Sequence, residues 1–174
     1  MASIGVLVSA TIVIVALTSC MPRERPVLLE VVDYGIIESD RVTMRPDETS
    51  SVGAKRANSL SMRIAVTTTR IPLRPGLSYG LAFRVTEAPL QEMSIKAVLR
   101  TSAPCVLKAT GNVVYHNDTV LKVRVGEVRH IGARIPASDS ENHCRGDPKP
   151  GTDTFQLYFG NRKLVERTFE VYRE

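Results

Sequence analysis

Short segments in which apolar and polar side chains alternate recur along this chain, and no other sequence feature constrains the fold as strongly. The clearest one is Val120–Val125, in which Leu121 and Val123 alternate with Lys122 and Arg124. Successive side chains of a β-strand point to opposite faces of the sheet, so this alternation predicts a half-buried strand with its cations outward. Beyond the N-terminal segment, no stretch repeats its apolar residues at the helical spacing. The sequence therefore predicts an all-β chain.

Turn and loop signals divide the chain into eight or nine predicted strands. Pro104 is expected to end the strand that begins at Ser94. We expect loops at Arg41–Asn58 and Ala137–Thr152 and turns at Ile71–Gly76, His116–Thr119, Gly126–Glu127 and Gly160–Asn161. The pattern predicts an antiparallel β-sandwich over residues 27–174, immunoglobulin-like in the loose sense, with a β-barrel as the alternative.

The N-terminal segment is predicted to be an export signal over residues 1–19. Ile4–Leu17 is an uncharged stretch of 14 residues, short for a membrane-spanning helix of about 20 residues but typical of a signal-peptide core. Two alternatives stay open, which are an uncleaved anchor helix and an ordinary cleaved signal with a coincidental cysteine. The positively charged residues that usually begin a signal peptide are absent, because the only positive charge in Met1–Ser3 is that of the amino terminus.

Leu17-Thr18-Ser19-Cys20 resembles the lipobox of bacterial lipoproteins. The resemblance implies that diacylglycerol is attached to the Cys20 thiol, that the chain is cut before Cys20, and that residues 20–26 tether the domain to a membrane. Two or more acyl chains make such attachment durable. Met21 follows the cysteine where Asp is the usual inner-membrane retention signal, so the resemblance implies the bacterial cell envelope, at the outer membrane facing the periplasm.

The other two cysteines, Cys105 and Cys144, are predicted to form one disulfide, as two thiols in an oxidising compartment do most simply. The bridge would close a loop of about 40 residues and contribute roughly 3–4 kcal/mol by the chain-entropy model. His143 precedes Cys144, but no C-x-x-C pair or second histidine at ligand spacing accompanies them. We therefore expect no metal site.

The charge balance favours anionic partners. The net charge is +5 and the sequence pI is about 9.3, but the charges are interspersed and form no long basic run. Lys122 and Arg124 lie on one face of their strand, and this face is our candidate for contact with an envelope protein or an anionic glycan. Nucleic-acid binding would need a basic patch with stacking aromatics, and the sequence shows neither.

No catalytic motif of a known class is present, so we expect a protein that is not an enzyme and needs no cofactor. A hydrolase with an unrecognised site is the alternative, which a pocket uniting two or more of His116, His130, Asp33 and Glu38 would favour. Arg145-Gly146-Asp147 spells an integrin-binding tripeptide in the second polar loop. A host-facing adhesin is therefore a further alternative.

Two groups of short motifs resemble a bacterial family of secreted proteins known only as a domain of unknown function. They are Thr69–Pro72, Pro75-Gly76, Tyr79-Gly80 and Phe83–Val85, and then Phe155–Leu157, Asn161–Leu164 and Phe169–Val171. The resemblance covers most of Val27–Tyr172 and implies a sandwich fold and an envelope location, but no activity. Together these features predict a lipid-anchored envelope module that binds a protein or an anionic polymer.

Overall fold

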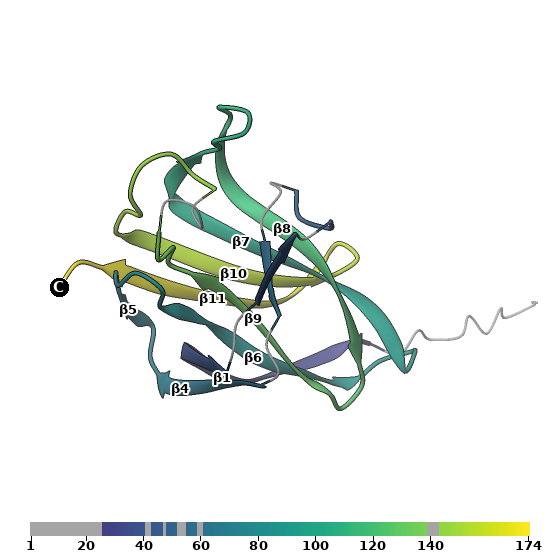
Figure 1. The fold of residues 1–174 in the computed structure, drawn as a ribbon. Coiled ribbons are helices and arrows are strands. Elements are labelled where there is room, and N and C mark those ends of the chain that lie inside the picture. Colours follow the sequence, from purple (N-terminus) through teal and green to yellow (C-terminus); the bar gives the residue numbers. More distant parts are fainter. Residues whose placement is uncertain (1–25, 41–42, 47, 52–54, 59–60, 139–142) are drawn as a thin grey trace, which may run out of the picture.

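The computed structural model describes residues 26–40, 43–46, 48–51, 55–58, 61–138 and 143–174 (Figure 1). Its strands are β1 (Leu28–Asp40), β2 (Thr43–Pro46), β3 (Lys55–Asn58), β4 (Ser61–Thr67), β5 (Arg70–Pro72), β6 (Ser78–Glu87), β7 (Glu92–Val106), β8 (Val113–Arg124), β9 (Val128–Arg134), β10 (Gly151–Phe159) and β11 (Arg162–Tyr172). None of these described residues belongs to a helix that could cross a membrane. The predicted signal and the residues before Pro26, Cys20 included, lie outside the described part.

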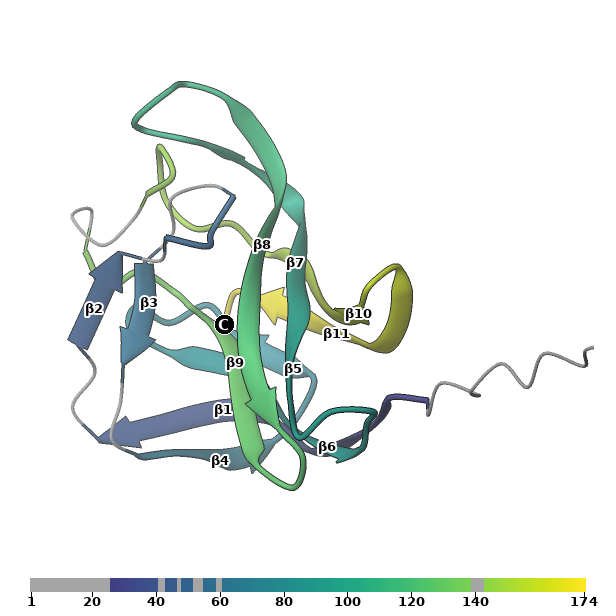
Figure 2. The ribbon, with the colours of Figure 1, turned by 90° about the vertical axis from the view of Figure 1, so that its right-hand side faces the viewer.

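Two sheets pack face to face. The four-stranded sheet has the order β4-β1-β6-β9, and the five-stranded sheet has the order β5-β11-β10-β7-β8. The strand pairs are antiparallel except for β5, which runs parallel to β11. Strands β2 and β3 form a separate two-stranded ribbon, visible on the left of Figure 2. The described strands thus build the predicted β-sandwich and not the alternative barrel.

The core lies between the two sheets and is centred on three aromatic rings. Tyr79 of β6 faces Phe155 of β10 and Phe169 of β11, with ring centroids 5.5–6.1 Å apart in edge-to-face arrangements. Such pairs stabilise a core beyond the effect of the area they bury. Aliphatic side chains from both sheets surround the three rings.

A buried polar contact also joins the sheets. The hydroxyl of Tyr79 donates a short hydrogen bond to the carboxylate of Asp153 on β10. Burial raises the pKa of Asp153 above its ordinary value, although hydrogen bonds from Tyr79 and Thr101 oppose that rise. Burial likewise raises the pKa of Tyr79, which the negative charge of Asp153 raises further. The two groups therefore link the sheets at a site where ionisation is unfavourable.

A row of glycines crosses the four-stranded sheet. Gly80 of β6 pairs with Gly35 of β1 on one side and with Gly132 of β9 on the other. A Cβ atom at Gly80 would lie 2.0 Å from the carbonyl oxygen of Ile131, which is backbone and cannot move aside. The strands approach each other there only because side chains are missing.

Two predicted interruptions of strands are wrong. Residues His116–Thr119 do not form a turn but belong to β8, where the segment at Ser50–Ser51 covers their edge with the bonds Ser51 N to Asp118 O (3.1 Å) and Ser50 Oγ to Asn117 Oδ1 (2.8 Å). Pro104 does not end β7, because it lies where the β7–β8 register shifts. A proline at such an irregularity removes no ladder hydrogen bond.

Two segments that we predicted to be irregular contain strands. Part of the loop predicted at Arg41–Asn58 forms the β2–β3 ribbon, whose main-chain bonds need no apolar alternation. The turn predicted at Ile71–Gly76 begins inside β5. Pro72 is tolerated there because β5 is an edge strand, and the fully buried Ile71 anchors it.

Candidate binding face on the five-stranded sheet

The alternation in β8 orients its side chains as the sequence predicts. Leu121 and Val123 are buried in the core, whereas Lys122 and Arg124 are exposed. Val125 is half-buried and packs against the core. The two cations therefore point outward from the five-stranded sheet.

Strand β7 brings further cations to the same face. Its inward residues Met93, Ile95 and Ala97 are buried, while Lys96 and Arg100 are exposed. In the β7–β8 register Lys122 lies opposite Ser94, and Arg100 lies opposite His116.

Strands β10 and β11 extend this surface. Tyr158 of β10 pairs with Lys96 on one side and Lys163 on the other. We use the name cationic face for the outward surface that carries Lys96, Arg100, Lys122, Arg124 and Lys163.

Three of these five cations are neutralised by carboxylates. Lys96 contacts Asp118 at 2.7 Å, Arg124 contacts Glu92 at 3.1 Å, and Lys163 contacts Glu166 at 2.5 Å. The hydrogen bond from Lys96, helped by one from Ser51, lowers the pKa of Asp118. The hydrogen bond from Lys163, with one from Gln156, lowers the pKa of Glu166 in the same way. These acids are therefore held in their charged forms, and they cancel the cations beside them.

Lys122 and Arg100 are the two exceptions. Among the described residues, neither forms an ion pair with a carboxylate. The excess positive charge of the cationic face therefore lies at these two side chains, although the charge of Arg100 also helps to lower the pKa of Glu166. Sequence reasoning found Lys122 but missed Arg100, Lys96 and Lys163, because only the strand register brings these residues onto one surface.

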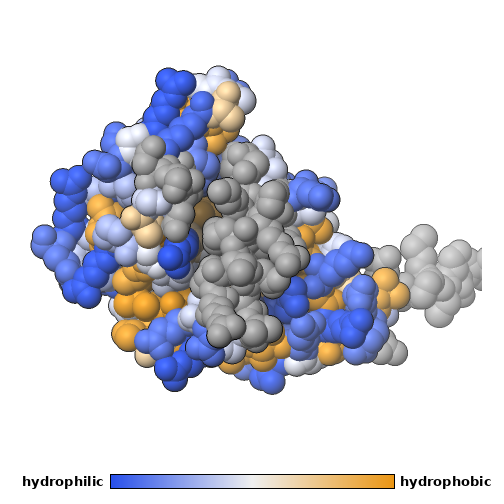
Figure 3. All heavy atoms as spheres, viewed as in Figure 1, coloured by the Kyte–Doolittle hydropathy of each residue, from blue (hydrophilic) through white to orange (hydrophobic). Residues whose placement is uncertain are grey.

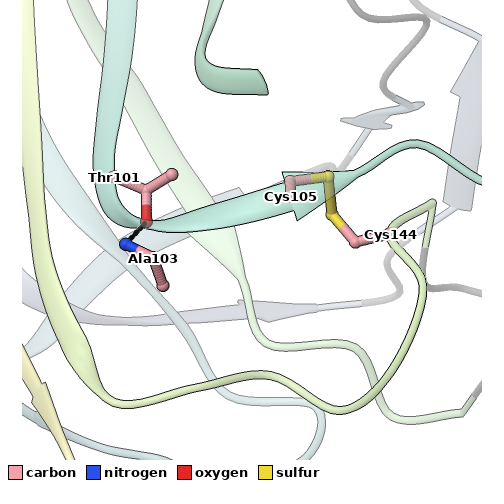
Figure 4. The surroundings of a disulfide bond; sticks show 4 residues. All are labelled: Thr101, Ala103, Cys105 and Cys144. Atoms are coloured by element: carbon pink, nitrogen blue, oxygen red, sulfur yellow. Dashed lines mark hydrogen bonds between the residues drawn. A yellow bond between two sulfur atoms is a disulfide. The ribbon is translucent and has the colours of Figure 1, made fainter. Parts of the chain in front are cut away.

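The predicted disulfide is present. Cys105 of β7 is bonded to Cys144, with Cα atoms 5.2 Å apart (Figure 4). Beside the bridge, the backbone N–H of Ala103 donates to Thr101 Oγ1 at 3.2 Å. Main-chain bonds from Lys108 to His143 (2.9 Å) and from Arg145 to Val106 (2.8 Å) hold the loop on both sides of Cys144. The bridge thus fastens the polar loop before β10 to the end of β7.

His143 lies beside the bridge, and its ligand atom and the two sulfurs lie within 4.8 Å of one another. The two sulfurs are bonded to each other, so neither is the thiolate that a zinc site requires. Burial, and the nearby charge of Lys108, lower the pKa of His143. A neutral imidazole beside a disulfide supplies too few ligands for a metal site in this oxidised form.

The tripeptide Arg145-Gly146-Asp147 follows the bridge directly. All three residues are exposed, and Gly146 has a φ of 77°. The loop lies at the opposite end of the sandwich from the point where the chain enters at Val27 (Figure 1). The structure thus presents the tripeptide on a fastened surface turn.

The residues named for the hydrolase alternative are divided between the two sheets. His116 is on the cationic face, whereas Asp33 and Glu38 are on β1 and His130 is on β9 of the other sheet. Asp33 and His130 both pair with Ala82 of β6, so two strand spacings, about 10 Å, separate their backbones.

Asp33 and Glu38 are held by neighbouring residues. Asp33 accepts hydrogen bonds from Tyr34 N at 2.7 Å and Thr67 Oγ1 at 2.9 Å, and Glu38 pairs with Arg63 at 2.7 Å. Burial, and the charge of Arg129, lower the pKa of His130.

A shallow hollow of about 330 Å³ lies at the far end of the sandwich from the chain entry. It is lined by Leu73, Ile135, Pro148 and Arg173 among others, and Asp147 reaches its rim. None of His116, His130, Asp33 and Glu38 lines it. The hollow therefore does not unite the residues that the hydrolase alternative requires.

Comparison with known proteins supports the fold. No protein-family model matches this chain, and no curated protein matches it either. Among solved structures, an immunoglobulin-like protein from Pseudomonas aeruginosa is similar, with a TM-score of 0.58 and 16% sequence identity over 86% of this chain and 99% of that one. The fold is an immunoglobulin-like β-sandwich. At this level of identity the likeness concerns the fold alone, and the resemblance to a secreted family of unknown function stays a prediction.

Proposed function

We propose that this protein is a non-enzymatic, lipid-anchored module of the bacterial cell envelope that binds an anionic polymer through its cationic face. The observation that carries the proposal is the pair Lys122 and Arg100, which project from one sheet surface without a carboxylate partner among the described residues. An anionic chain can neutralise these charges without first displacing an internal ion pair. An unsatisfied cation on a solvated surface attracts anions at longer range than a paired one.

The envelope location is supported by the likeness of Leu17–Cys20 to a lipobox and by the disulfide, which is typical of exported proteins. Labelling of growing cells with a palmitate analogue tests the anchor. We expect the wild-type protein to be labelled and the Cys20→Ala variant not to be. Equal labelling of both would contradict lipidation at Cys20.

Binding of the purified domain to polygalacturonate, a carboxylated glycan, tests the cationic face. We expect Lys122→Glu with Arg100→Glu to weaken binding about ten-fold or more at low salt, where charges are least screened. Lys149→Glu is the matched control for Lys122→Glu, because each changes the net charge by the same amount and Lys149 is exposed in the loop before β10, toward the other end of β7 from Lys122. If Lys149→Glu weakens binding as much as Lys122→Glu, the net charge matters and the face does not.

A protein partner is the other outcome of this test. If no anionic polymer binds the wild-type domain, cross-linking in cells followed by capture of the lipidated protein would identify the partner. Loss of that partner in the Lys122→Glu variant would keep the face as the binding surface while changing the class of ligand.

The adhesin alternative has one observation in its favour, which is the exposed position of Arg145-Gly146-Asp147 at the end away from the chain entry. Adhesion of integrin-bearing cells to the immobilised domain tests it. Asp147→Glu keeps the charge but lengthens the side chain, so a real tripeptide site would lose adhesion. Unchanged adhesion would refute this alternative.

A further inference from the structure

The end of the sandwich where the chain enters is built from three segments that lie side by side. Strand β1 starts at Leu28, opposite Glu87 at the end of β6. The β6–β7 and β8–β9 turns are bonded there, because Val125 N donates to Gln91 O at 3.1 Å and Gly126 N donates to Val85 O at 2.9 Å. Both ribbon views place these turns beside the start of β1 (Figures 1 and 2). We call this region the entry end.

Three large apolar side chains of the entry end are exposed. Leu90, in the β6–β7 turn, has 66% of its surface exposed, the largest value among the large hydrophobic residues described. Leu28 and Val128 are 43% and 41% exposed, and both lie on strands that flank β6 near the same end. Figure 3 shows hydrophobic atoms among the charged ones where the chain enters the domain. Exposure of such apolar side chains to water is unfavourable.

Three described cations of the entry end are paired with carboxylates. Arg84 contacts Glu30 at 3.1 Å, Arg129 contacts Glu127 at 3.0 Å, and Arg124 contacts Glu92 at 3.1 Å. Glu87 is the one acid of this end without such a partner among the described residues. Moving a paired charge toward an apolar medium costs less desolvation free energy than moving an unpaired one. The entry end therefore combines exposed apolar side chains with paired charges, and it shares Arg124 with the cationic face.

The length of the chain before the domain limits how far the entry end can stand from a membrane. Val27 is only 4% exposed and is fixed in the core. It follows Cys20 by seven residues, which span at most about 25 Å when fully extended. The polar headgroup layer takes up part of that distance. A lipid on Cys20 would thus keep the entry end within about 25 Å of the bilayer.

From this geometry we infer that the entry end is a membrane-contacting surface, in which Leu90, with Leu28 and Val128 beside it, enters the interfacial layer of the bilayer that holds the anchor. The inference rests on the proposed lipidation at Cys20. A short tether gives the entry end a high effective concentration at the membrane, so three side chains suffice for contact although they would not bind by themselves. The contact fixes the orientation of the domain, with the disulfide end directed away from the membrane.

The chain contains no tryptophan, so a single introduced tryptophan reports its own surroundings. The experiment uses full-length lipidated Leu90→Trp, reconstituted into phosphatidylethanolamine and phosphatidylglycerol vesicles with or without brominated acyl chains. We expect bromine to quench the emission about two-fold and the emission maximum to move to shorter wavelength, as for a side chain buried several ångströms into the interface. Tyr115→Trp is the matched control, because Tyr115 is 54% exposed near the other end of β8. Its emission should not change.

The possible outcomes distinguish a failure of the membrane-contact inference from a failure of the proposed lipidation at Cys20. If the protein is lipidated and floats with the vesicles but Leu90→Trp is not quenched, the membrane-contacting surface is refuted while the anchor stands. Equal quenching of Leu90→Trp and Tyr115→Trp refutes a fixed orientation. If the protein carries no lipid, both the anchor and the inference fall. Leu28→Trp provides a second reporter should Leu90→Trp fail to fold.

Discussion

The two sheets of this sandwich differ in how the charged residues on their outer surfaces are paired. On the four-stranded sheet, Arg63 pairs with Glu38, and Arg84 pairs with Glu30. On the five-stranded sheet, Lys122 and Arg100 have no such partner among the described residues. Strand register sets which charges lie beside one another, and it leaves the unpaired cations on the five-stranded sheet.

The two sheets also differ in how their backbones are held. The four-stranded sheet contains the glycine row at Gly35, Gly80 and Gly132, where strands approach too closely for side chains. The five-stranded sheet is instead fastened at one end by the Cys105–Cys144 bridge. We regard the first as the sheet that fixes the fold and the second as the sheet that carries the proposed binding surface. The following predictions test that comparison.

The largest expected effect is that of Gly80→Ala. Its Cβ atom would lie 2.0 Å from a backbone oxygen, so we expect the free energy of unfolding to fall by about 4 kcal/mol or more. Gly160→Ala in the β10–β11 turn is the control. Nothing lies within 4 Å of its Cβ position, and only the positive φ of 55° opposes the substitution, which should cost about 1 kcal/mol. Urea unfolding measures both, and equal losses would contradict a steric role for Gly80.

Removal of the disulfide should have the next largest effect. The bridge spans 39 residues of sequence, and its loss in Cys105→Ser with Cys144→Ser should lower the free energy of unfolding by about 3–4 kcal/mol. Replacing both cysteines avoids a free thiol. A loss below about 1 kcal/mol would show that the loop is held by its main-chain hydrogen bonds alone.

The buried contact between the sheets should give a pH-dependent effect. Because burial raises the pKa of Asp153, the folded protein binds this proton more tightly than the unfolded chain does. Asp153 therefore stabilises the fold most below its ordinary pKa, and that contribution is lost as the pH rises through the folded-state value.

Asp153→Asn should remove this dependence, since its amide oxygen can still accept the hydrogen bond from Tyr79. The free energy of unfolding of the variant, relative to the wild type, should increase as the pH rises from about 3 to about 7. Asp147→Asn in the exposed loop controls for the loss of one negative charge. A constant difference across this pH range would contradict the role of burial.

The smallest expected effect on stability is that of Lys122→Glu. Since its side chain is exposed and makes no ion pair with a described residue, the free energy of unfolding should change by less than about 0.5 kcal/mol. Lys96→Glu should lower it more, by up to about 1 kcal/mol, because it breaks the pair with Asp118 and places two acids together. Thermal unfolding of the two variants compares them, and the reverse order would show that Lys122 is part of the fold.

The sequence allowed some of these features to be predicted because they are local. The alternation around Leu121 and Val123 identified the buried side of β8, and Gly160-Asn161 correctly marked a two-residue hairpin turn. The bonding of Cys105 to Cys144 followed from there being only two further cysteines.

Other features depend on strand register, which a single sequence does not reveal. The presence of Arg100 and Lys122 on one surface arises from pairing between β7 and β8, and the long strand through His116–Thr119 is supported by bonds from Ser50 and Ser51. The parallel pairing of β5 with β11 likewise joins residues that are far apart in the chain.

The central claim is that the five-stranded sheet, and not the four-stranded one, binds an anionic polymer. Chemical-shift mapping of the isotope-labelled domain during titration with polygalacturonate tests it most directly. We predict that the amides around Lys122, Lys96 and Arg100 shift progressively, that those around Arg63 and Arg84 do not, and that the shifts disappear at high salt. Shifts spread equally over both sheets, or confined to the four-stranded sheet, would contradict the claim.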